Sequence, residues 1–319
     1  MKTAIPFICN PHYPFAADWI DALQQAMPGE KIVPLHALDA QAKAVCTVAI
    51  VANPLPEDLR QLPQLKWVHS VWAGVERLVT DLADTDLADT DLKIVRLVDP
   101  QLADTMAEAV LAWTLYLHRD MPAYAAQQAN RQWLAQDYTR PEDKTVGLLG
   151  LGALGEASAR RLVNAGFKVR GWSRTRRDVS NVECFAGDAE LPAMLAKTDI
   201  LVCLLPLTAH TKGLLNATML GHLPERASLI NFARGPIVCD DALRATLESR
   251  RIKHAVLDVF SVEPLPPDSW QWGNPHVTVL PHISAPTDRR TASAIVARNI
   301  RNYHESGAIP ESVDRARGY

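Results

Sequence analysis

Residues 146–155 read VGLLGLGALG, and this stretch decides the fold of the larger part of the chain. It carries glycines at positions 150, 152 and 155, in the pattern G-x-G-x-x-G. An apolar run typical of a strand precedes the glycines, an amphipathic stretch typical of a helix follows them, and another apolar run comes next. In this context the pattern predicts a turn that binds the pyrophosphate of a dinucleotide.

Each residue of the turn has a predicted task. Gly150 makes the tight bend, Gly152 lets the backbone approach the pyrophosphate, and Gly155 lets the helix pack closely on the strand. Ala153 and Leu154 open the helix, whose first backbone N–H groups and partial positive charge favour phosphate. The alternative is that the glycines merely permit a sharp turn between strand and helix.

The residues after the second strand of this unit discriminate between the two nicotinamide dinucleotides. An NAD site carries Asp or Glu there to hold the ribose 2′-hydroxyl. This chain has Ser173, Arg174 and Thr175, followed by two more arginines. A guanidinium binds a 2′-phosphate through two parallel hydrogen bonds, whereas a carboxylate repels it. The sequence therefore predicts NADP(H) as the cofactor, and a solvated basic turn is the alternative.

Short apolar runs alternate with amphipathic stretches along almost the whole chain. This alternation predicts parallel sheets with helices on both faces, and the runs are continuously apolar, as in strands covered on both sides. At about 150 residues a domain, the 319 residues allow two domains. We expect an α/β protein with two doubly wound parallel-sheet domains. The predicted strands are residues 3–9, 44–51, 65–71, 94–98, 145–149, 168–172, 200–205, 228–232, 254–259 and 277–280. The predicted helices are residues 18–27, 57–62, 76–82, 105–119, 154–165, 240–249 and 289–305.

Two local patterns refine this outline. Thr105 and Glu108 match a capping box, which predicts that a helix begins at Thr105, and Pro122 is expected to break that helix. Residues 80–92 read TDLADTDLADTDL, a repeated acidic unit that we interpret as a solvated loop or helix extension. The repeat lacks the glycine and the terminal Glu of a calcium-binding loop.

Composition excludes several classes of function. The net charge is −3 and no basic run is interleaved with aromatic residues, so we expect no nucleic-acid partner. The five cysteines are widely spaced without a CxxC pair, which favours reduced thiols in the cytoplasm over disulfides or structural zinc. The N-terminal apolar run is too short for a signal peptide, and no run approaches the ~20 residues that span a bilayer. We expect a cytoplasmic protein without a membrane anchor.

Three polar side chains follow successive strands of the second half. Arg234 comes after the strand at 228–232, Glu263 after the strand at 254–259, and His282 after the strand at 277–280. Open α/β sheets bind ligands beyond the carboxyl ends of their strands. We therefore expect these three side chains to converge. A metal site built on Glu263 and His282 is disfavoured, because no second histidine lies at ligand spacing.

In order and identity these motifs resemble those of the D-isomer-specific 2-hydroxyacid dehydrogenases, over nearly the whole length of the chain. The landmarks are the glycine turn, the strand-end Arg-Gly, the run from Asp258 to Pro264, and Pro281-His282. Within that family the chain resembles the A-type glyoxylate/hydroxypyruvate reductases. This closer match rests on GWSRTR at 171–176, EPLPP at 263–267 and VDRARGY at 313–319.

The resemblance implies a reductase that transfers a hydride from NADPH to a small 2-oxo acid, glyoxylate or hydroxypyruvate. His282 would protonate the forming alkoxide, and Glu263 would orient the imidazole and raise its pKa. Arg234 would bind the substrate carboxylate and polarise the keto oxygen. Asp258 would contact the nicotinamide end of the cofactor. Another 2-hydroxyacid dehydrogenase of the family, or a non-catalytic NAD(P)-sensing regulator, is the alternative.

The resemblance also implies the domain organisation and the remaining contacts. A flavodoxin-like substrate domain would span residues 1–102 and a Rossmann-type NADP-binding domain residues 103–284, with the helix in 285–319 returning to the substrate domain. The other implied features are substrate contacts at Trp72, Ala73 and Gly74, cofactor contacts at Pro206 and Thr208, and a homodimer formed through the segment around 105–140. Trp72 departs from the family, where a small residue is more usual. The Trp72 indole would either narrow the substrate pocket and favour short acids, or pack away from that pocket.

Overall fold

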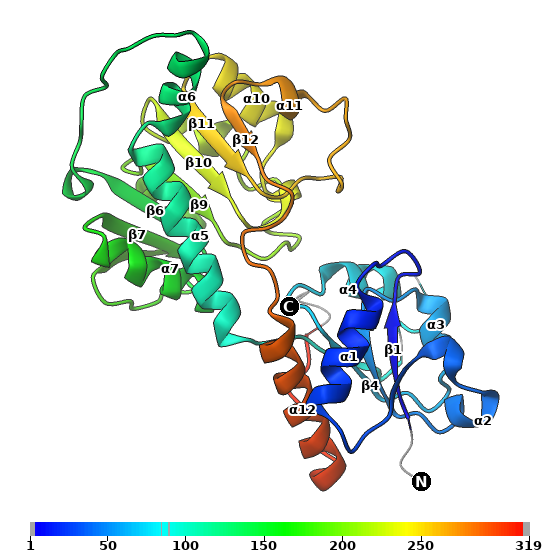
Figure 1. Cartoon of the computed structure of the whole chain (residues 1–319). Helices are drawn as coiled ribbons and strands as arrows, with labels where there is room; N and C mark the ends of the chain where they lie inside the picture. Colours follow the sequence, from blue (N-terminus) through cyan, green and yellow to red (C-terminus); the bar gives the residue numbers. More distant parts are fainter. Residues whose placement is uncertain (1–3, 84, 89, 315–319) are drawn as a thin grey trace. The chain divides into compact units, whose positions relative to one another are not determined.

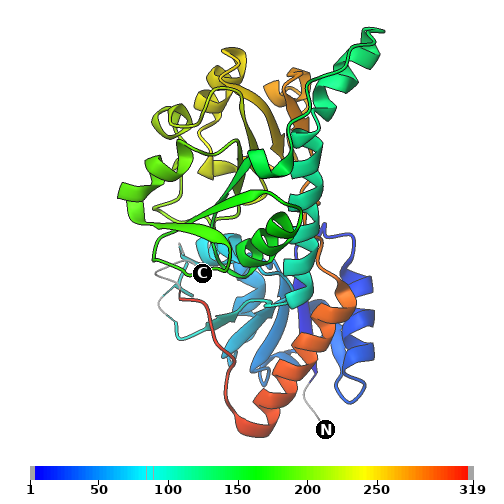
Figure 2. The ribbon, with the colours of Figure 1, turned by 90° about the vertical axis from the view of Figure 1, so that its left-hand side faces the viewer.

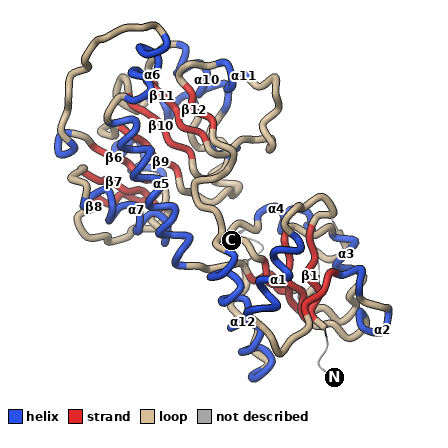
Figure 3. The backbone as a smooth tube through the Cα atoms, viewed as in Figure 1, coloured by secondary structure: helices blue, strands red, loops and turns tan. Residues whose placement is uncertain are grey.

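The computed structural model of the chain describes residues 4–83, 85–88 and 90–314. Within these residues the chain divides into two compact units, one comprising 4–101 and 287–314 and the other Leu102–Pro286 (Figure 1). Each unit is built on a parallel sheet, of five strands in the first and seven in the second, and helices lie on both sides of each sheet (Figure 3). The predicted fold class is therefore confirmed. No described helix has both the length and the apolar character needed to cross a membrane.

The first unit has the strand order β2-β1-β3-β4-β5, which is the flavodoxin-like order. Its strands are β1 (Ile5–Cys9), β2 (Ile32–Pro34), β3 (Val48–Ala52), β4 (Trp67–Ser70) and β5 (Lys93–Val95). Its helices are α1 (Ala16–Ala26), η1 (Leu35–Ala37), α2 (Ala40–Lys43), α3 (Pro56–Arg60), α4 (Glu76–Ala83) and α12 (Arg289–Ser306).

Successive residues of a strand point to opposite faces of the sheet, and the first unit buries both faces in this way. Phe7 of β1 packs in one core with α1 and α12, whereas Ile8 packs in another core with α3 and α4. The continuous apolar runs of the sequence follow directly from this double burial.

The second unit has the strand order β12-β11-β10-β9-β6-β7-β8, in which the chain crosses from one half of the sheet to the other after β8. Its strands are β6 (Thr145–Leu149), β7 (Lys168–Ser173), β8 (Val182–Ala186), β9 (Ile200–Cys203), β10 (Ala227–Asn231), β11 (Ile252–Leu257) and β12 (Val277–Val279). Its helices are α5 (Pro100–His118), α6 (Met121–Ala129), η2 (Pro141–Asp143), α7 (Ala153–Asn164), α8 (Gly187–Leu195), α9 (Ala217–Gly221), η3 (Gly235–Ile237), α10 (Asp240–Glu248) and α11 (Trp270–Gly273). This is the Rossmann arrangement, with the point of reversal between β6 and β9.

The structure corrects the predicted limits of one helix. α5 begins at Pro100, so Thr105 lies inside the helix and does not cap it, and the capping-box prediction is wrong. The Asp99 carboxylate accepts the Gln101 N–H at 2.9 Å, and proline suits a first helical turn. α5 ends at His118, and Pro122 does not break it but lies in the first turn of α6. α6 and the exposed segment at 130–138 extend away from the sheet of their unit (Figure 2).

Two sequence predictions fall partly on residues outside the described set. Of the acidic repeat at 80–92, residues 80–83 complete α4 and the other described residues form turns, bends and loop, while 84 and 89 are not described. Of the 313–319 tail, only Val313 and Asp314 are described, and Val313 N–H bonds to Ile94 C=O at 2.7 Å.

Candidate active site

The predicted catalytic residues lie on the loops after three neighbouring strands. β10, β11 and β12 are adjacent and parallel, so their carboxyl ends meet at one edge of the sheet. Arg234 follows β10, Glu263 follows β11 and His282 follows β12. The positive charge of Arg234 also acts on both other groups and lowers the pKa of Glu263 and of His282. The structure thus brings the three side chains together.

Glu263 and His282 form a directly hydrogen-bonded pair. His282 Nδ1 and Glu263 Oε2 lie 2.7 Å apart. The other carboxylate oxygen accepts the Phe260 backbone N–H at 2.9 Å. A carboxylate can only accept, so Nδ1 carries the proton in this contact, and Glu263 does not engage Nε2.

The pair shifts the pKa of both partners toward the charged forms. The hydrogen bond from Glu263 raises the pKa of His282 above its ordinary value, against opposing effects of burial and of Arg234. Burial raises the pKa of Glu263, but the hydrogen bonds from His282 and Phe260 lower it by more, so its net pKa lies below the ordinary value. The arrangement favours an imidazolium next to a carboxylate.

A second carboxylate fixes the backbone of the histidine. Asp258, which is 2% exposed, accepts the Ile283 N–H at 2.7 Å with one oxygen and the Ser284 N–H at 2.9 Å with the other. His282 has a left-handed φ of 56°, a conformation that is costly for most residues. Asp258 therefore holds the turn that presents His282, and its predicted contact with the nicotinamide stays a prediction.

Arg234 is positioned by a residue that sequence reasoning missed. Asn231, at the end of β10, donates from Nδ2 to Arg234 C=O at 3.2 Å and accepts the Ala233 N–H at 3.2 Å. A Cβ on Gly235 would lie 2.1 Å from the Phe260 carbonyl carbon, so only glycine lets the Arg234 loop pack against the segment that anchors Glu263. The sequence signal for Asn231 was a polar residue at the end of a strand that is apolar apart from Ser228.

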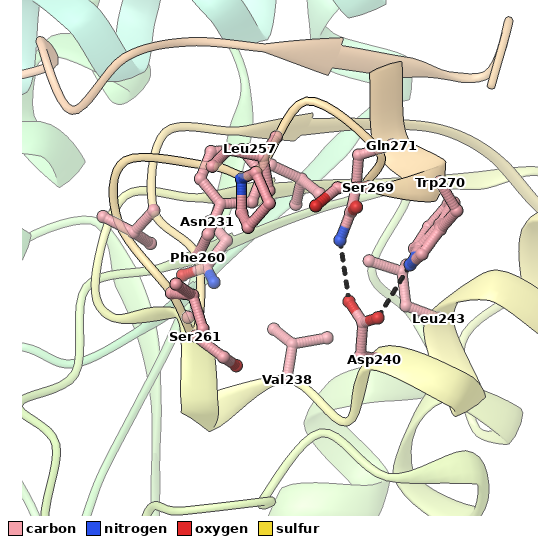
Figure 4. A pocket seen from close by; sticks show the side chains of 15 residues that line it. Asn231, Val238, Asp240, Leu243, Leu257, Phe260, Ser261, Ser269, Trp270 and Gln271 are labelled. Carbon is pink, nitrogen blue, oxygen red and sulfur yellow. Dashed lines mark hydrogen bonds between the residues drawn. The ribbon is translucent and has the colours of Figure 1, made fainter. Parts of the chain in front are cut away.

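A cavity of about 230 Å³ lies behind this edge and is drawn in Figure 4. Asn231 and Phe260 line it on the side of the catalytic loops. On another side Asp240, the first residue of α10, accepts hydrogen bonds from Trp270 Nε1 at 2.7 Å and Gln271 Nε2 at 3.0 Å. These bonds tie the end of the loop that carries Glu263 to α10.

The glycine turn fits a dinucleotide. Gly150 has a φ of 104°, and a Cβ on Gly155 would lie 1.9 Å from Gly150 C=O, so neither position accepts another residue. Gly152 is exposed and has open space around its Cβ position. It precedes Ala153 and Leu154, the first residues of α7, whose unpaired N–H groups mark the end of the helix that favours phosphate.

The basic turn that follows β7 contains one arginine held by other side-chain and backbone groups, and an exposed arginine that is the predicted phosphate contact. Arg176 bonds to the Glu190 carboxylate and donates to Cys184 C=O. Arg174 is exposed, and in the described part of the chain it makes no hydrogen bond or ion pair. Ser173 Oγ donates to Thr175 C=O at 2.7 Å, which shapes the turn. Arg174 and Arg177 are thus both exposed, and Arg174, the first of them after β7, is the predicted contact of the 2′-phosphate.

The loop after β9 is organised by a threonine that sequence reasoning did not select. Thr211 Oγ1 donates to Pro206 C=O at 2.6 Å and accepts the Thr208 N–H at 2.8 Å. Both predicted cofactor residues of this loop are therefore held by one hydroxyl, and they lie beyond the carboxyl end of the strand next to β6.

The predicted substrate loop lies in the first unit, directly after β4. Its Trp72 N–H donates to Ser70 Oγ at 3.0 Å, and its Trp72 C=O accepts the Leu97 N–H at 3.0 Å. Trp72, Ala73 and Gly74 are all half-buried. No group of three or more His, Cys, Asp or Glu among the described residues could hold a metal ion.

A glycine turn on a Rossmann sheet, with an Arg, Glu and His beyond neighbouring strands, defines a nicotinamide-dependent oxidoreductase. Residues 111–284 match the model of the D-isomer specific 2-hydroxyacid dehydrogenase NAD binding domain. The chain belongs to this family, as its sequence motifs predicted.

Solved structures of similar proteins cover the chain almost completely. A D-isomer specific 2-hydroxyacid dehydrogenase from Xanthobacter autotrophicus Py2, in complex with NADPH and MES, is 38% identical with a TM-score of 0.90, covering 99% of this chain and 100% of its own. An NADPH-dependent glyoxylate/hydroxypyruvate reductase from Sinorhizobium meliloti, in complex with NADP and sulfate, is 33% identical with a TM-score of 0.89, covering 100% of both chains. A probable 2-hydroxyacid dehydrogenase from Rhizobium etli, in complex with NADP, HEPES and L(+)-tartaric acid, is 30% identical with a TM-score of 0.86, covering 99% of this chain and 100% of its own.

Proposed function

We propose that the protein reduces the keto group of a small 2-oxo acid, glyoxylate or hydroxypyruvate, at the expense of NADPH. The observation that carries this proposal is the His282–Glu263 pair, 2.7 Å between Nδ1 and Oε2, with Arg234 close by at the carboxyl edge of the dinucleotide-binding sheet. Bound NADPH supplies the hydride.

The residues of the chain provide the proton and the charge. His282, protonated at both nitrogens, gives the Nε2 proton to the oxygen that becomes the hydroxyl. Glu263 keeps the imidazole charged and oriented, because its hydrogen bond favours the imidazolium. The Arg234 guanidinium binds the substrate carboxylate and stabilises negative charge on the keto oxygen. In the first unit the family resemblance assigns substrate contacts to Trp72, Ala73 and Gly74, and this assignment stays a prediction.

The cofactor assignment rests on the basic turn. Arg174 is exposed after β7 with no carboxylate at the position of an NAD-type Asp or Glu, and it binds the 2′-phosphate together with Ser173 and Thr175. Pro206, Thr208 and Asp258 would contact other parts of the bound cofactor. The structures of relatives from Xanthobacter, Sinorhizobium and Rhizobium, which hold NADPH or NADP, support this assignment.

A panel of short 2-oxo acids, each assayed with NADPH and with NADH, tests the function. We expect NADPH to be oxidised with glyoxylate and hydroxypyruvate, and faster than NADH. If tight NADPH binding occurs without turnover of any 2-oxo acid, the chain is a cofactor-sensing regulator and the proposal is wrong. Turnover mainly in the oxidative direction on a 2-hydroxy acid would instead indicate another dehydrogenase of the family.

We also propose a homodimer in the cytoplasm. Large apolar side chains are exposed along α6 and the segment after it, with Trp133 fully exposed and Leu134 and Tyr138 each about two-thirds exposed (65% and 64%). Large apolar side chains exposed together in one segment are typical of protein–protein contacts. Light scattering should give twice the chain mass for the native protein and the single mass for Trp133→Asp; a monomeric native protein would refute the dimer. All five cysteines are free, as expected in a reducing compartment.

A further inference from the structure

The segment that carries Glu263 borders a cavity instead of a fully packed surface. It runs from the end of β11 to the start of α11. Ser261 and Leu265 of this segment line the cavity of about 230 Å³, together with Val238 and Leu243 from the region of α10 (Figure 4). Because side chains do not fill this space, contacts with α10 fix the segment less firmly here, and the anchoring of its two ends matters more.

The end of the segment next to β11 is fixed to the neighbouring loops. The Asp258 N–H donates to Asn231 C=O at 3.1 Å, and the Asp258 carboxylate accepts two N–H groups of the turn after β12. A Cβ on Gly235 would lie 2.1 Å from the Phe260 carbonyl carbon, so the loop after β10 packs directly on this end. The Phe260 N–H in turn donates to Glu263 Oε1 at 2.9 Å. The near end is thus held to the loops after β10 and β12.

The far end of the segment is held by the Asp240 carboxylate. Asp240, the first residue of α10, accepts Trp270 Nε1 at 2.7 Å with one oxygen and Gln271 Nε2 at 3.0 Å with the other (Figure 4). Trp272, also in α11, donates from Nε1 to Pro266 C=O at 3.0 Å. This bond ties α11 to the part of the segment that directly follows the glutamate, so the position of α11 is transmitted to it.

We propose that Asp240 is a positioning residue for the proton-donating pair. By holding Trp270 and Gln271 it fixes the far end of the segment and keeps the Glu263 carboxylate on the His282 imidazole. The inference rests on the proposed function, in which this pair holds and delivers the proton. All of its contacts lie within the second unit.

The experiment compares the pH dependence of 2-oxo acid reduction in the native protein and in Asp240→Ala. When the segment loosens, Glu263 stabilises the imidazolium less. The decline of kcat/KM at high pH should therefore move to lower pH, in the direction expected for Glu263→Gln but by less. Near neutral pH we expect kcat/KM for glyoxylate to fall about tenfold, because a misplacement of about 1 Å can cost about 100-fold. A loss of folded protein would scale the rate at every pH and leave the midpoint unchanged.

Further variants grade the effect. Asp240→Asn keeps one acceptor oxygen, and Trp270→Phe removes one of the two donors, so each should shift the midpoint less than Asp240→Ala. Both keep the test valid if Asp240→Ala does not fold. In the Glu263→Gln background, Asp240→Ala should add almost no further shift, because substitutions that act through the same contact are not additive.

Asp241→Asn is the matched control. Asp241 also lies in the first turn of α10, where its charge interacts favourably with the helix end. In the described part of the chain its side chain makes no hydrogen bond or ion pair. Asp241→Asn should therefore leave both the midpoint and the rate close to the native values. An equal shift in Asp240→Ala and Asp241→Asn would assign the effect to the helix end and overturn the inference.

An NMR titration of the His282 imidazole measures its pKa without turnover, with His282→Ala identifying the signal. This pKa should be lower in Asp240→Ala than in the native protein. An unchanged pKa in Asp240→Ala, Asp240→Asn and Trp270→Phe overturns the inference, whatever the activity. If the native protein reduces no 2-oxo acid, the proposed function fails, and the titration still decides whether Asp240 positions Glu263.

Discussion

The loops after β10, β11 and β12, which form the catalytic edge, and the basic turn after β7 belong to the same sheet. They differ in how firmly the chain holds their functional side chains. At the edge, Glu263 holds the His282 imidazole and Asp258 holds its backbone. At the turn, Arg174 extends into solvent with no hydrogen bond or ion pair to the described residues. Groups that stabilise the charge developing in the transition state act best when they are already fixed in place. A side chain that binds a phosphate can instead become ordered when the phosphate binds. Loss of a fixed group should therefore affect turnover, and loss of the exposed one should affect coenzyme choice.

The largest effect is expected at the histidine. His282→Ala removes the proton donor and should lower kcat for 2-oxo acid reduction by a factor on the order of 10² to 10⁴, with NADPH binding retained. Steady-state kinetics and NADPH fluorescence titration measure the two quantities. His276→Ala, before β12 in the same unit, is the control and should keep most activity. Near-normal turnover of His282→Ala would remove this residue from the mechanism.

A smaller effect, with a pH signature, is expected at the carboxylate. The proton donor must be charged, so reduction should decline as pH rises through the His282 pKa. Glu263 raises that pKa, and Glu263→Gln should therefore move the decline to lower pH. Loss of a hydrogen bond between charged groups is also expected to lower kcat/KM about 10-fold to 100-fold near neutral pH. A pH profile of kcat/KM that keeps its midpoint in Glu263→Gln would contradict this role.

The smallest effect on turnover is expected at the basic turn. Arg174→Gln should lower the NADPH-to-NADH preference about tenfold while kcat with saturating NADPH changes little. Arg176→Gln is the matched comparison, because Arg176 is already engaged by Glu190 and Cys184 C=O, and it should shift the preference less. If Arg174→Gln keeps the native preference for NADPH over NADH, another residue binds the 2′-phosphate.

Strong local patterns made most of the fold predictable, and weak ones account for the elements that were missed. The glycine turn and the apolar strands of the second unit were predicted within a few residues. β8 was missed because its sequence, VECFA, mixes polar and apolar residues at the edge of the sheet, where none of its residues is fully buried. β2 was also missed; it has three residues and ends at Pro34, a residue that is rare inside strands. The start of α5 was misplaced because a capping pattern inside the helix outweighed the proline at its first position.

The candidate site shows the same division. Side chains that perform chemistry follow strand ends, and sequence position alone selected Arg234, Glu263 and His282. The residues that position the loops of the site act through hydrogen bonds to backbone groups, either within one loop or between two loops. Asn231 and Thr211 hold backbone groups of their own loops, and Asp258 reaches across to the turn at Ile283. Such contacts become visible only when the loops are folded.

The convergence of Arg234 and His282 on one bound substrate is tested most directly by a crystal structure of the protein with NADP and oxamate, an unreactive analogue of a small 2-oxo acid. We predict that the Arg234 guanidinium binds the oxamate carboxylate and that His282 Nε2 lies within hydrogen-bonding distance of the amide oxygen, which takes the place of the keto oxygen. Oxamate bound away from His282, or NADP bound without its nicotinamide at the carboxyl edge of β10 and β11, would contradict the account.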